Sequence, residues 1–317
     1  PSDDFLQAVT LLATMKRYRE HVNGTVPDGR APAISCKRKD ILKLKRDDYL
    51  EHRDAVVKGF LKAAKFLRMQ KIFISRDLPY RTQIVPLAAT LAVLGDEADN
   101  DTVRKLLSRW YWCGVFGELY GSTIESRFAK DLPELIAWVR GGDEPTAVKE
   151  ATFSGTRLKE LTSRRSAAYN GIFALMMRDG CEDFSSGQPI DITSYYDENV
   201  DIHHIFPRKW CADHADEQGI KKHWTAVDCI INKAPLSART NRMIGGNAPS
   251  VYLRRIEKNE QIPAERLDQI LRSHVIDPEA LRNDDFWAFY NRRYEEILDR
   301  IEAAMGKPVI REEVETV

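Results

Sequence analysis

The stretch NVDIHHIFPRKW (residues 199–210) places two adjacent histidines, His203 and His204, between a short apolar and acidic run and a turn at Pro207. The run before them is long enough for a brief strand, and Pro207 favours the first turn of a helix after them. A buried strand has little use for two neighbouring imidazoles, whereas an ordinary pKa of about 6.5 suits proton transfer at neutral pH. The stretch therefore predicts a chemical role for the pair.

Two asparagines follow the histidines within a window of fifty residues. Asn232 lies in INKAPLS and Asn241 lies in TNRMIGGNAPS. We expect DCIINKAPLS (228–237) to form a second strand and APSVYLRRIEKN to form a helix. A hairpin followed by a helix would bring the histidines and asparagines together. That grouping suits phosphodiester hydrolysis, which needs a base near neutral pH and a divalent cation against the phosphate charge.

Apolar spacing predicts a mainly α-helical protein. In residues 3–22 and 53–69, as in most of the first 180 residues, apolar side chains recur every three or four positions. The aromatic-rich run at 110–120 has the same spacing. We therefore expect these aromatic side chains in the core rather than on a base-stacking surface.

A change in pattern predicts two domains. EDFSSGQPIDITSYYDEN (182–199) introduces Gly, Pro, Ser and Asp and ends the helical period. We expect an N-terminal helical domain over 1–182 and a C-terminal helical domain over 183–317. The core of the second domain, 199–258, would contain a small ββα unit.

Charge is balanced over the whole chain, with 48 Lys and Arg against 48 Asp and Glu. Bulk charge therefore neither favours nor excludes a polyanionic partner. Residues 37–71 carry twelve bases against five acids, net +7, and residues 221–258 carry eight against two, net +6. Both stretches could face nucleic acid, although for the first a solvated helical face is the simpler explanation.

The remaining composition indicates a cytoplasmic protein without a membrane segment. The five cysteines form no CxxC pair and fit a reducing compartment: Cys36, Cys113, Cys181, Cys211 and Cys229. No run of about 18 apolar residues is present, so we expect no membrane span. The chain starts at Pro1 in a helical pattern without an initiator Met, so we expect a fragment of a longer protein.

DIHHIFP, INKAPLS and TNRMIGGNAPS together resemble the HNH nuclease motif, a ββα-metal finger. They are most similar to the HNH domain at the C-terminal end of GmrSD-type restriction endonucleases and their phosphorothioate-sensing relatives. ISCKRKDILKL, LPYRTQIVPLAATLAVLG, WYWCGVFGELYGSTIESRFAKDL and RRSAAYNGIFALMMRDG resemble the helical middle section of the same proteins. The resemblance implies a metal-dependent DNA endonuclease that acts in bacterial restriction and anti-phage defence.

The family pattern also implies roles for single residues. His204 matches the general base, and His203 and Asn241 match the metal ligands. Asn232 matches the residue that pins the loop by hydrogen bonds and keeps the base oriented. An imidazole at 203 in place of a carboxylate favours Mn²⁺ or Ni²⁺ over Mg²⁺, or leaves Mg²⁺ weakly held. Asp201, on the same strand face as His203, is a candidate for the missing carboxylate.

Further expectations concern DNA and partner domains. Five cations flank the clusters as candidate DNA contacts, each with a solvated surface role as its alternative: Arg208, Lys209, Lys233, Arg239 and Arg242. Relatives of this kind carry an N-terminal NTPase domain that senses modified DNA through a DGQQR-type motif. That motif is absent here, so the sensor is an expected partner outside this chain. Cutting both strands with one site per chain would require two passes or a homodimer.

Two alternatives remain open at this point. The chain could be a nucleic-acid-binding or assembly module whose nuclease site is degenerate. It could instead be a zinc-stabilised nucleic-acid binder. Zinc ligand types are plentiful, but their spacings match no paired zinc motif: His203, His204, Cys211, His214, His223 and Cys229.

Overall fold

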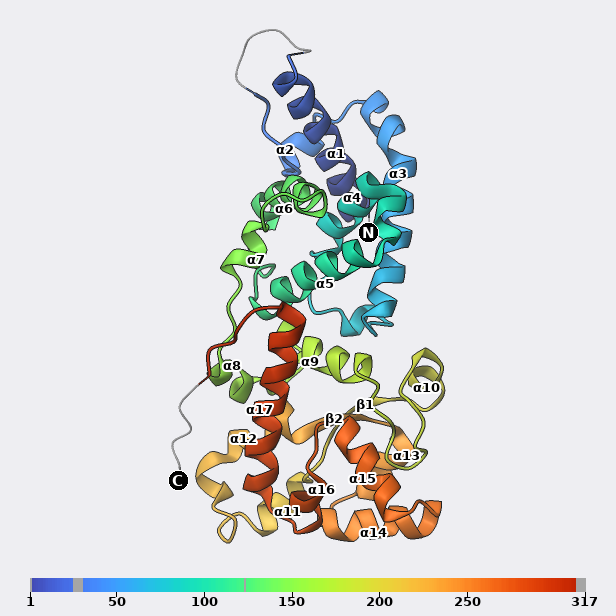
Figure 1. Cartoon of the computed structure of the whole chain (residues 1–317), viewed down its shortest axis with the longest axis vertical. Coiled ribbons are helices and arrows are strands. Elements are labelled where there is room, and N and C mark those ends of the chain that lie inside the picture. Colours follow the sequence, from blue (N-terminus) through green and yellow to red (C-terminus); the bar gives the residue numbers. More distant parts are fainter. Residues whose placement is uncertain (1, 25–30, 123, 312–317) are drawn as a thin grey trace. The chain divides into compact units, whose positions relative to one another are not determined.

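The computed structural model describes residues 2–24, 31–122 and 124–311 (Figure 1). Helices account for 66% of the structure and strands for 4%, which confirms the predicted mainly α-helical class. Over the described residues, no helix is both long enough and apolar enough to cross a membrane.

The chain forms two compact units. Unit 1 comprises Pro1–Arg68 and Tyr80–Thr152, and unit 2 comprises Met69–Pro79 and Phe153–Val317. This division differs from the boundary expected at 182/183, because residues 153–182 pack within unit 2. Ile230 N–H donates to Leu161 O at 2.8 Å, and Lys233 Nζ donates to Thr162 O at 3.0 Å. The composition shift marks where the helical period stops, whereas the packing boundary depends on where the preceding helices bury their side chains.

Unit 1 is helical. Its elements are α1 (Ser2–Val22), α2 (Arg38–Ile41), α3 (Arg46–Met69, whose last residue falls in unit 2), α4 (Ile84–Leu94), η2 (Gly95–Asp99), α5 (Asp101–Phe116), α6 (Ile124–Val139) and α7 (Thr146–Glu150). Helix α4 packs against both α1 and α6. The aromatic-rich run lies on α5 and the turn after it, and its large rings, from Trp110 to Tyr120, are at most 2% exposed. These rings are core, as their spacing predicts.

Unit 2 contains the only strands in the described part of the chain. Its elements are η1 (Ser75–Asp77), α8 (Gly155–Glu160), α9 (Ala167–Arg178), α10 (Ile192–Asp197), β1 (Asp201–His204), α11 (Arg208–Asp213), η3 (Ile220–His223), α12 (Trp224–Asp228), η4 (Ile230–Asn232), β2 (Lys233–Leu236), α13 (Ala238–Ile244), α14 (Pro249–Glu260), α15 (Ala264–Ser273), α16 (Pro278–Arg282) and α17 (Phe286–Met305). Strands β1 and β2 are antiparallel, with Asp201 opposite Leu236 and His204 opposite Lys233.

Helix α13 follows β2 directly, whereas α11, η3, α12 and η4 lie between β1 and β2. The Ser237 hydroxyl caps α13 by accepting from Thr240 N–H at 3.1 Å. This helix contains Asn241, and the helix expected over APSVYLRRIEKN is the next one, α14. Strand β2 is also shorter than the strand expected over 228–237.

A buried arginine explains the short second strand. Arg293 of α17 is fully buried and donates to the carbonyls of Ile230, Ile231 and His274. These bonds take up the 230–231 carbonyls that a longer strand would need for pairing, so the chain forms the short 3-10 turn η4 there. Because the guanidinium comes from a helix 60 residues away in the sequence, no local pattern indicates it.

The buried imidazole of His274 makes stability depend on pH. Its Nε2–H donates to Glu182 O at 2.6 Å, and burial lowers its pKa to about 4. An unfolded histidine binds a proton near pH 6.5, so unfolding takes up a proton between those two pH values. We expect the free energy of unfolding to fall as pH drops from 6.5 to 4, by roughly 1.4 kcal/mol per pH unit from this group. Urea unfolding at stepped pH measures it.

The matched variants are His274→Gln and His223→Gln, the second at an exposed position. The first should flatten the dependence of unfolding free energy on pH over this window, and the second should leave it unchanged. Equal slopes in wild type and His274→Gln would contradict the assignment.

Candidate functional site

One hollow in unit 2 brings together residues of both predicted clusters. It has a volume of about 380 Å³ and is lined by His203 and His204 of β1, Arg208 and Lys209 of α11, and Asn241 of α13, beside apolar and glycine residues. The antiparallel pairing of β1 with β2, followed at once by α13, places these side chains around the same space. The hollow therefore contains two imidazoles, one carboxamide and two cations.

His204 has a carboxylate partner that the sequence analysis did not predict. Its Nε2 lies 3.2 Å from Oδ1 of Asp228, at the end of α12, and the same oxygen lies 3.2 Å from Nε of Arg208. A proton on Nε2 can be donated to this carboxylate, which leaves Nδ1 as the acceptor. Burial lowers the pKa of His204, and Lys233 acts in the same direction, while Asp228 opposes both. The ring is therefore suited to be neutral at neutral pH.

Asp228 could have been noticed in the sequence. It is the single acidic residue between positions 221 and 256, within a stretch that is otherwise strongly basic. An isolated carboxylate among so many cations indicates a specific partner. Its pairing with His204 could not be predicted, because 24 residues separate the two.

The imidazole of His203 and the carboxamide of Asn241 are free to bind a ligand. Within the described part of the chain, neither side chain forms a hydrogen bond, although both line the hollow. Burial lowers the pKa of His203; Asp201 opposes this effect and Arg164 adds to it. A neutral imidazole nitrogen and a carboxamide oxygen are acceptable ligands for a transition ion such as Mn²⁺ or Ni²⁺. These residues fit a divalent cation as a partial ligand set.

Asp201 is engaged elsewhere. Its carboxylate pairs with Arg164 and accepts from Ile202 N–H at 2.7 Å. Burial alone would raise the pKa of Asp201, but these two hydrogen bonds, together with the positive charges of Arg164 and Arg76, lower it. Arg164 also pairs with Asp77, which accepts a hydrogen bond from the Tyr195 hydroxyl. The carboxylate does not line the hollow, so it could serve as a metal ligand only if Arg164 released it.

Three of the six residues considered as zinc ligands contact backbone carbonyls instead. The thiol of Cys211 faces Phe206 O at 3.8 Å, and that of Cys229 faces Ala226 O at 3.4 Å. His214 lies on Trp210, with its Nδ1 2.9 Å from the Trp210 carbonyl. Across residues 2–24, 31–122 and 124–311, no three His, Cys, Asp or Glu side chains group around a point that could hold a metal ion. All five cysteines are buried and unpaired with one another.

Asn232 is fully buried and joins the two ends of the long connection between β1 and β2. Its Oδ1 accepts from Phe206 N–H at 2.8 Å, and its Nδ2 donates to Phe206 O at 2.9 Å and to Val227 O at 3.0 Å. Because Phe206 lies two residues after His204, these bonds fix the backbone that carries the imidazole. The side chain lies behind the hollow rather than in it.

Four of the five candidate DNA-binding cations remain exposed, Arg239 among them. Arg208 is 60% exposed, and Lys209 and Arg242 are also on the surface. The Lys209 side chain lies across Gly246, where a Cβ atom would stand 2.9 Å from Lys209 Cδ. Glycine at 246 therefore lets this lysine lie along the edge of the hollow.

Besides Arg208, which pairs with Asp228, two of the five cations have partners within the protein. Arg239 pairs with Glu260 at 2.6 Å. Lys233 is only 8% exposed, donates to Thr162 O and lies over the Tyr169 ring, and burial lowers its pKa. The expected DNA contact of Lys233 does not fit this placement, because β2 directs the side chain into the packing against residues 162–169.

No protein-family model matches the chain. The chain is 30% identical over 222 residues to an uncharacterized protein of Methanocaldococcus jannaschii. The alignment covers 65% of this chain and 36% of that protein, so the chain spans little more than a third of its relative's length. The relative's name states no activity, and the chemistry of this site must be argued from its own residues.

The two asparagines provide a matched pair for testing stability. Replacing Asn232 by Ala removes three hydrogen bonds and leaves buried Phe206 and Val227 backbone groups unsatisfied. We expect a loss on the order of 3 kcal/mol in the free energy of unfolding, measured by urea denaturation. Asn241→Ala, which removes no such bond, should change it by about 0.5 kcal/mol or less. Similar losses in both variants would contradict the positioning role of Asn232.

Proposed function

We propose that the chain is a metal-dependent DNA endonuclease of the HNH type. The observation that carries this proposal is the single hollow lined by His203, His204 and Asn241, with Arg208 and Lys209 beside them. A base, two free donor groups and two phosphate-binding cations in one space are the components that phosphodiester hydrolysis requires.

His204 acts as the general base in this proposal. Asp228 accepts the Nε2–H, which orients the ring and leaves Nδ1 to take a proton from a water molecule that attacks the phosphate. The lowered pKa keeps the imidazole neutral and able to accept that proton. Arg208 and Lys209 hold the backbone phosphates next to the scissile bond. Cleavage leaves a 5′ phosphate on one product and a 3′ hydroxyl on the other.

His203 and Asn241 hold the divalent cation. When bound, the cation would neutralise charge on the scissile phosphate and the leaving 3′ oxygen. Because both ligands are neutral, the site lacks the carboxylate that hard Mg²⁺ prefers. We therefore propose Mn²⁺ or Ni²⁺ as the better activators.

The biological setting extends the proposal through the sequence resemblance. As the effector part of a bacterial restriction or anti-phage protein, the chain would act in the cytoplasm on DNA selected by an NTPase sensor domain. Cleavage of both strands would take two passes or a homodimer.

A second candidate is a DNA-binding module whose nuclease site is degenerate. The observation that favours it is the pairing of Asp201 with Arg164, which leaves the hollow without an available carboxylate ligand. The two candidates differ in their need for His204. A nuclease loses cleavage when His204 is replaced, whereas a DNA-binding module keeps its binding to DNA.

A plasmid-nicking assay with Mn²⁺ tests the base. We expect His204→Ala to reduce the rate of supercoiled plasmid cleavage by roughly 10²- to 10⁴-fold, the usual contribution of a general base. His223→Ala is the matched control, because this exposed histidine of η3 does not line the hollow. Equal cleavage by wild type and His204→Ala would remove the catalytic assignment and favour the binding module.

The choice of metal is tested at position 203. His203→Asp supplies a carboxylate, so we expect the ratio of Mg²⁺-supported to Mn²⁺-supported cleavage to rise. His203→Ala should lose cleavage with both ions. An unchanged ion preference in His203→Asp, measured by titrating each metal into EDTA-treated protein, would exclude His203 as a ligand.

A further inference from the structure

A second cationic surface lies in unit 1, on helix α2 and the turns that flank it. Residues 37–46, which we call the α2 segment, contain six bases and one acid, Asp40. All six bases are exposed: Lys37, Arg38, Lys39, Lys43, Lys45 and Arg46. None of the four residues of α2 is buried. The hollow of unit 2 contains none of these residues.

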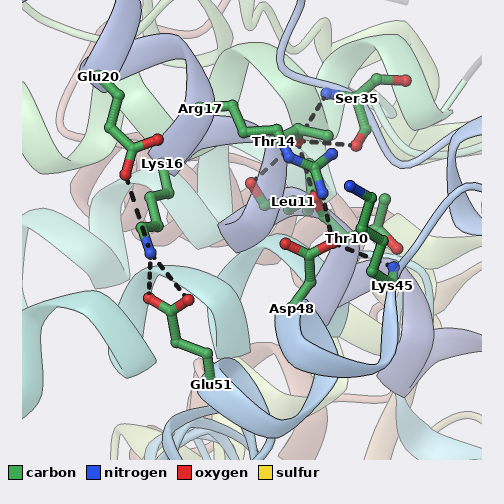
Figure 2. Close-up of polar contacts among 10 residues, drawn as sticks. All are labelled: Thr10, Leu11, Thr14, Lys16, Arg17, Glu20, Ser35, Lys45, Asp48 and Glu51. Atoms are coloured by element: carbon green, nitrogen blue, oxygen red, sulfur yellow. Dashed lines mark hydrogen bonds and ion pairs between the residues drawn. The ribbon is translucent and has the colours of Figure 1, made fainter. Parts of the chain in front are cut away.

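The α2 segment is held against α1 by defined contacts. Ser35 N–H donates to the Thr14 hydroxyl at 3.1 Å, and that hydroxyl lies 3.0 Å from Ser35 O, as Figure 2 shows. Cys36, the next residue, is fully buried. Main-chain turns then continue through Leu42 and Lys43, whose N–H groups donate to Arg38 O and Asp40 O. The cations are therefore presented from a fixed backbone.

Three of the acids around the α2 segment are already engaged. Asp40 accepts from the Ser35 hydroxyl at 2.7 Å, and Asp48 pairs with Arg17. Glu51 pairs with Lys16 of α1 at 2.6 Å, and Figure 2 shows both of these ion pairs beside the segment. Throughout the described residues, none of the six bases of the α2 segment forms an ion pair. With six bases against one acid, residues 37–46 therefore carry a net charge of +5.

Helix α3 provides the contrast within the same basic stretch. Arg53 pairs with Asp54, and Lys62 pairs with Asp99 at 2.8 Å. Two bases of α3 thus have internal partners, as expected for an ordinary solvated helical face. The surplus charge is concentrated at 37–46, where six exposed cations within ten residues repel one another. A polyanion would relieve that repulsion and release its own condensed counterions.

We propose that the α2 segment binds the phosphate backbone of DNA, as a contact separate from the cleavage hollow. The choice of DNA among polyanions rests on the proposed function. A lipid surface fits less well, because Leu42, 78% exposed, is the single large apolar side chain exposed in the segment, whereas Ile41 and Leu44 are partly buried. The contact would add sequence-independent affinity to the cleavage site.

The test measures binding rather than cleavage. A labelled DNA duplex is titrated with the His204→Ala chain in EDTA at several salt concentrations. In that background, we expect the triple variant Lys37→Gln/Lys39→Gln/Lys43→Gln to have a less steep salt dependence. The magnitude of the negative slope of log K against log salt should decrease by about 2 to 3, close to 0.9 per lost phosphate contact. We expect a Kd at least roughly ten-fold weaker at about 0.1 M salt.

The matched control removes three exposed lysines elsewhere in unit 1, as Lys65→Gln/Lys105→Gln/Lys130→Gln. This control has the same net charge and should keep the wild-type slope. Equal slopes for the two triple variants would overturn the proposal. Thermal melting of both variants, expected to match wild type because all six positions are exposed, shows that the fold is intact.

Anionic vesicles of phosphatidylcholine with one third phosphatidylserine form the other arm. We expect Leu42→Ser to keep full DNA affinity. Vesicle binding that is tighter than DNA binding and lost in Leu42→Ser would overturn the proposal in favour of a membrane contact. Because the readout is affinity in EDTA, loss of the α2 contact is distinguishable from failure of the nuclease assignment, which the plasmid assay reports.

Discussion

The buried carboxamide of Asn232 is the interaction on which the geometry of the hollow depends. It joins Phe206 and Val227, at the two ends of the connection between β1 and β2, and it has all its bonding groups satisfied. A fully bonded buried amide favours one arrangement strongly, because any shift leaves polar groups without partners. Arg293 adds to this by holding the backbone immediately before Asn232. The irregular connection after β1 thereby fixes the end of the strand that carries His204.

The electrostatics of the hollow follow from this framework. Asp228 touches both His204 and Arg208, so one carboxylate orients a base and a cation together. Arg164 has the opposite effect nearby, since it pairs with the Asp201 carboxylate and counteracts the effect of that carboxylate on the pKa of His203. The site therefore combines an aligned imidazole with donors of low charge, which suits a softer ion than Mg²⁺.

The sequence predicts what depends on local spacing. Helical periodicity indicated the mainly α class, and the adjacency of His203 and His204 to a strand and of Asn241 to a helix start allowed their grouping to be anticipated. What could not be predicted depends on distant partners. Arg164 is 37 residues from Asp201, and Arg293 is 62 residues from the carbonyl of Ile231 that it binds. The burial of Lys233 and the boundary after Thr152 likewise follow from packing, which no short pattern encodes.

The segment Met69–Pro79 belongs to unit 2, although both of its flanking segments belong to unit 1. The covalent chain therefore crosses from one unit to the other three times, and unit 2 is discontinuous. Cutting the gene at a single junction would not yield an autonomous C-terminal fragment. Residues 153–317 alone would lack Asp77, the buried counter-ion of Arg164. An isolated fragment would thus carry an altered charge balance directly beside β1, and its behaviour would not represent that of the intact chain.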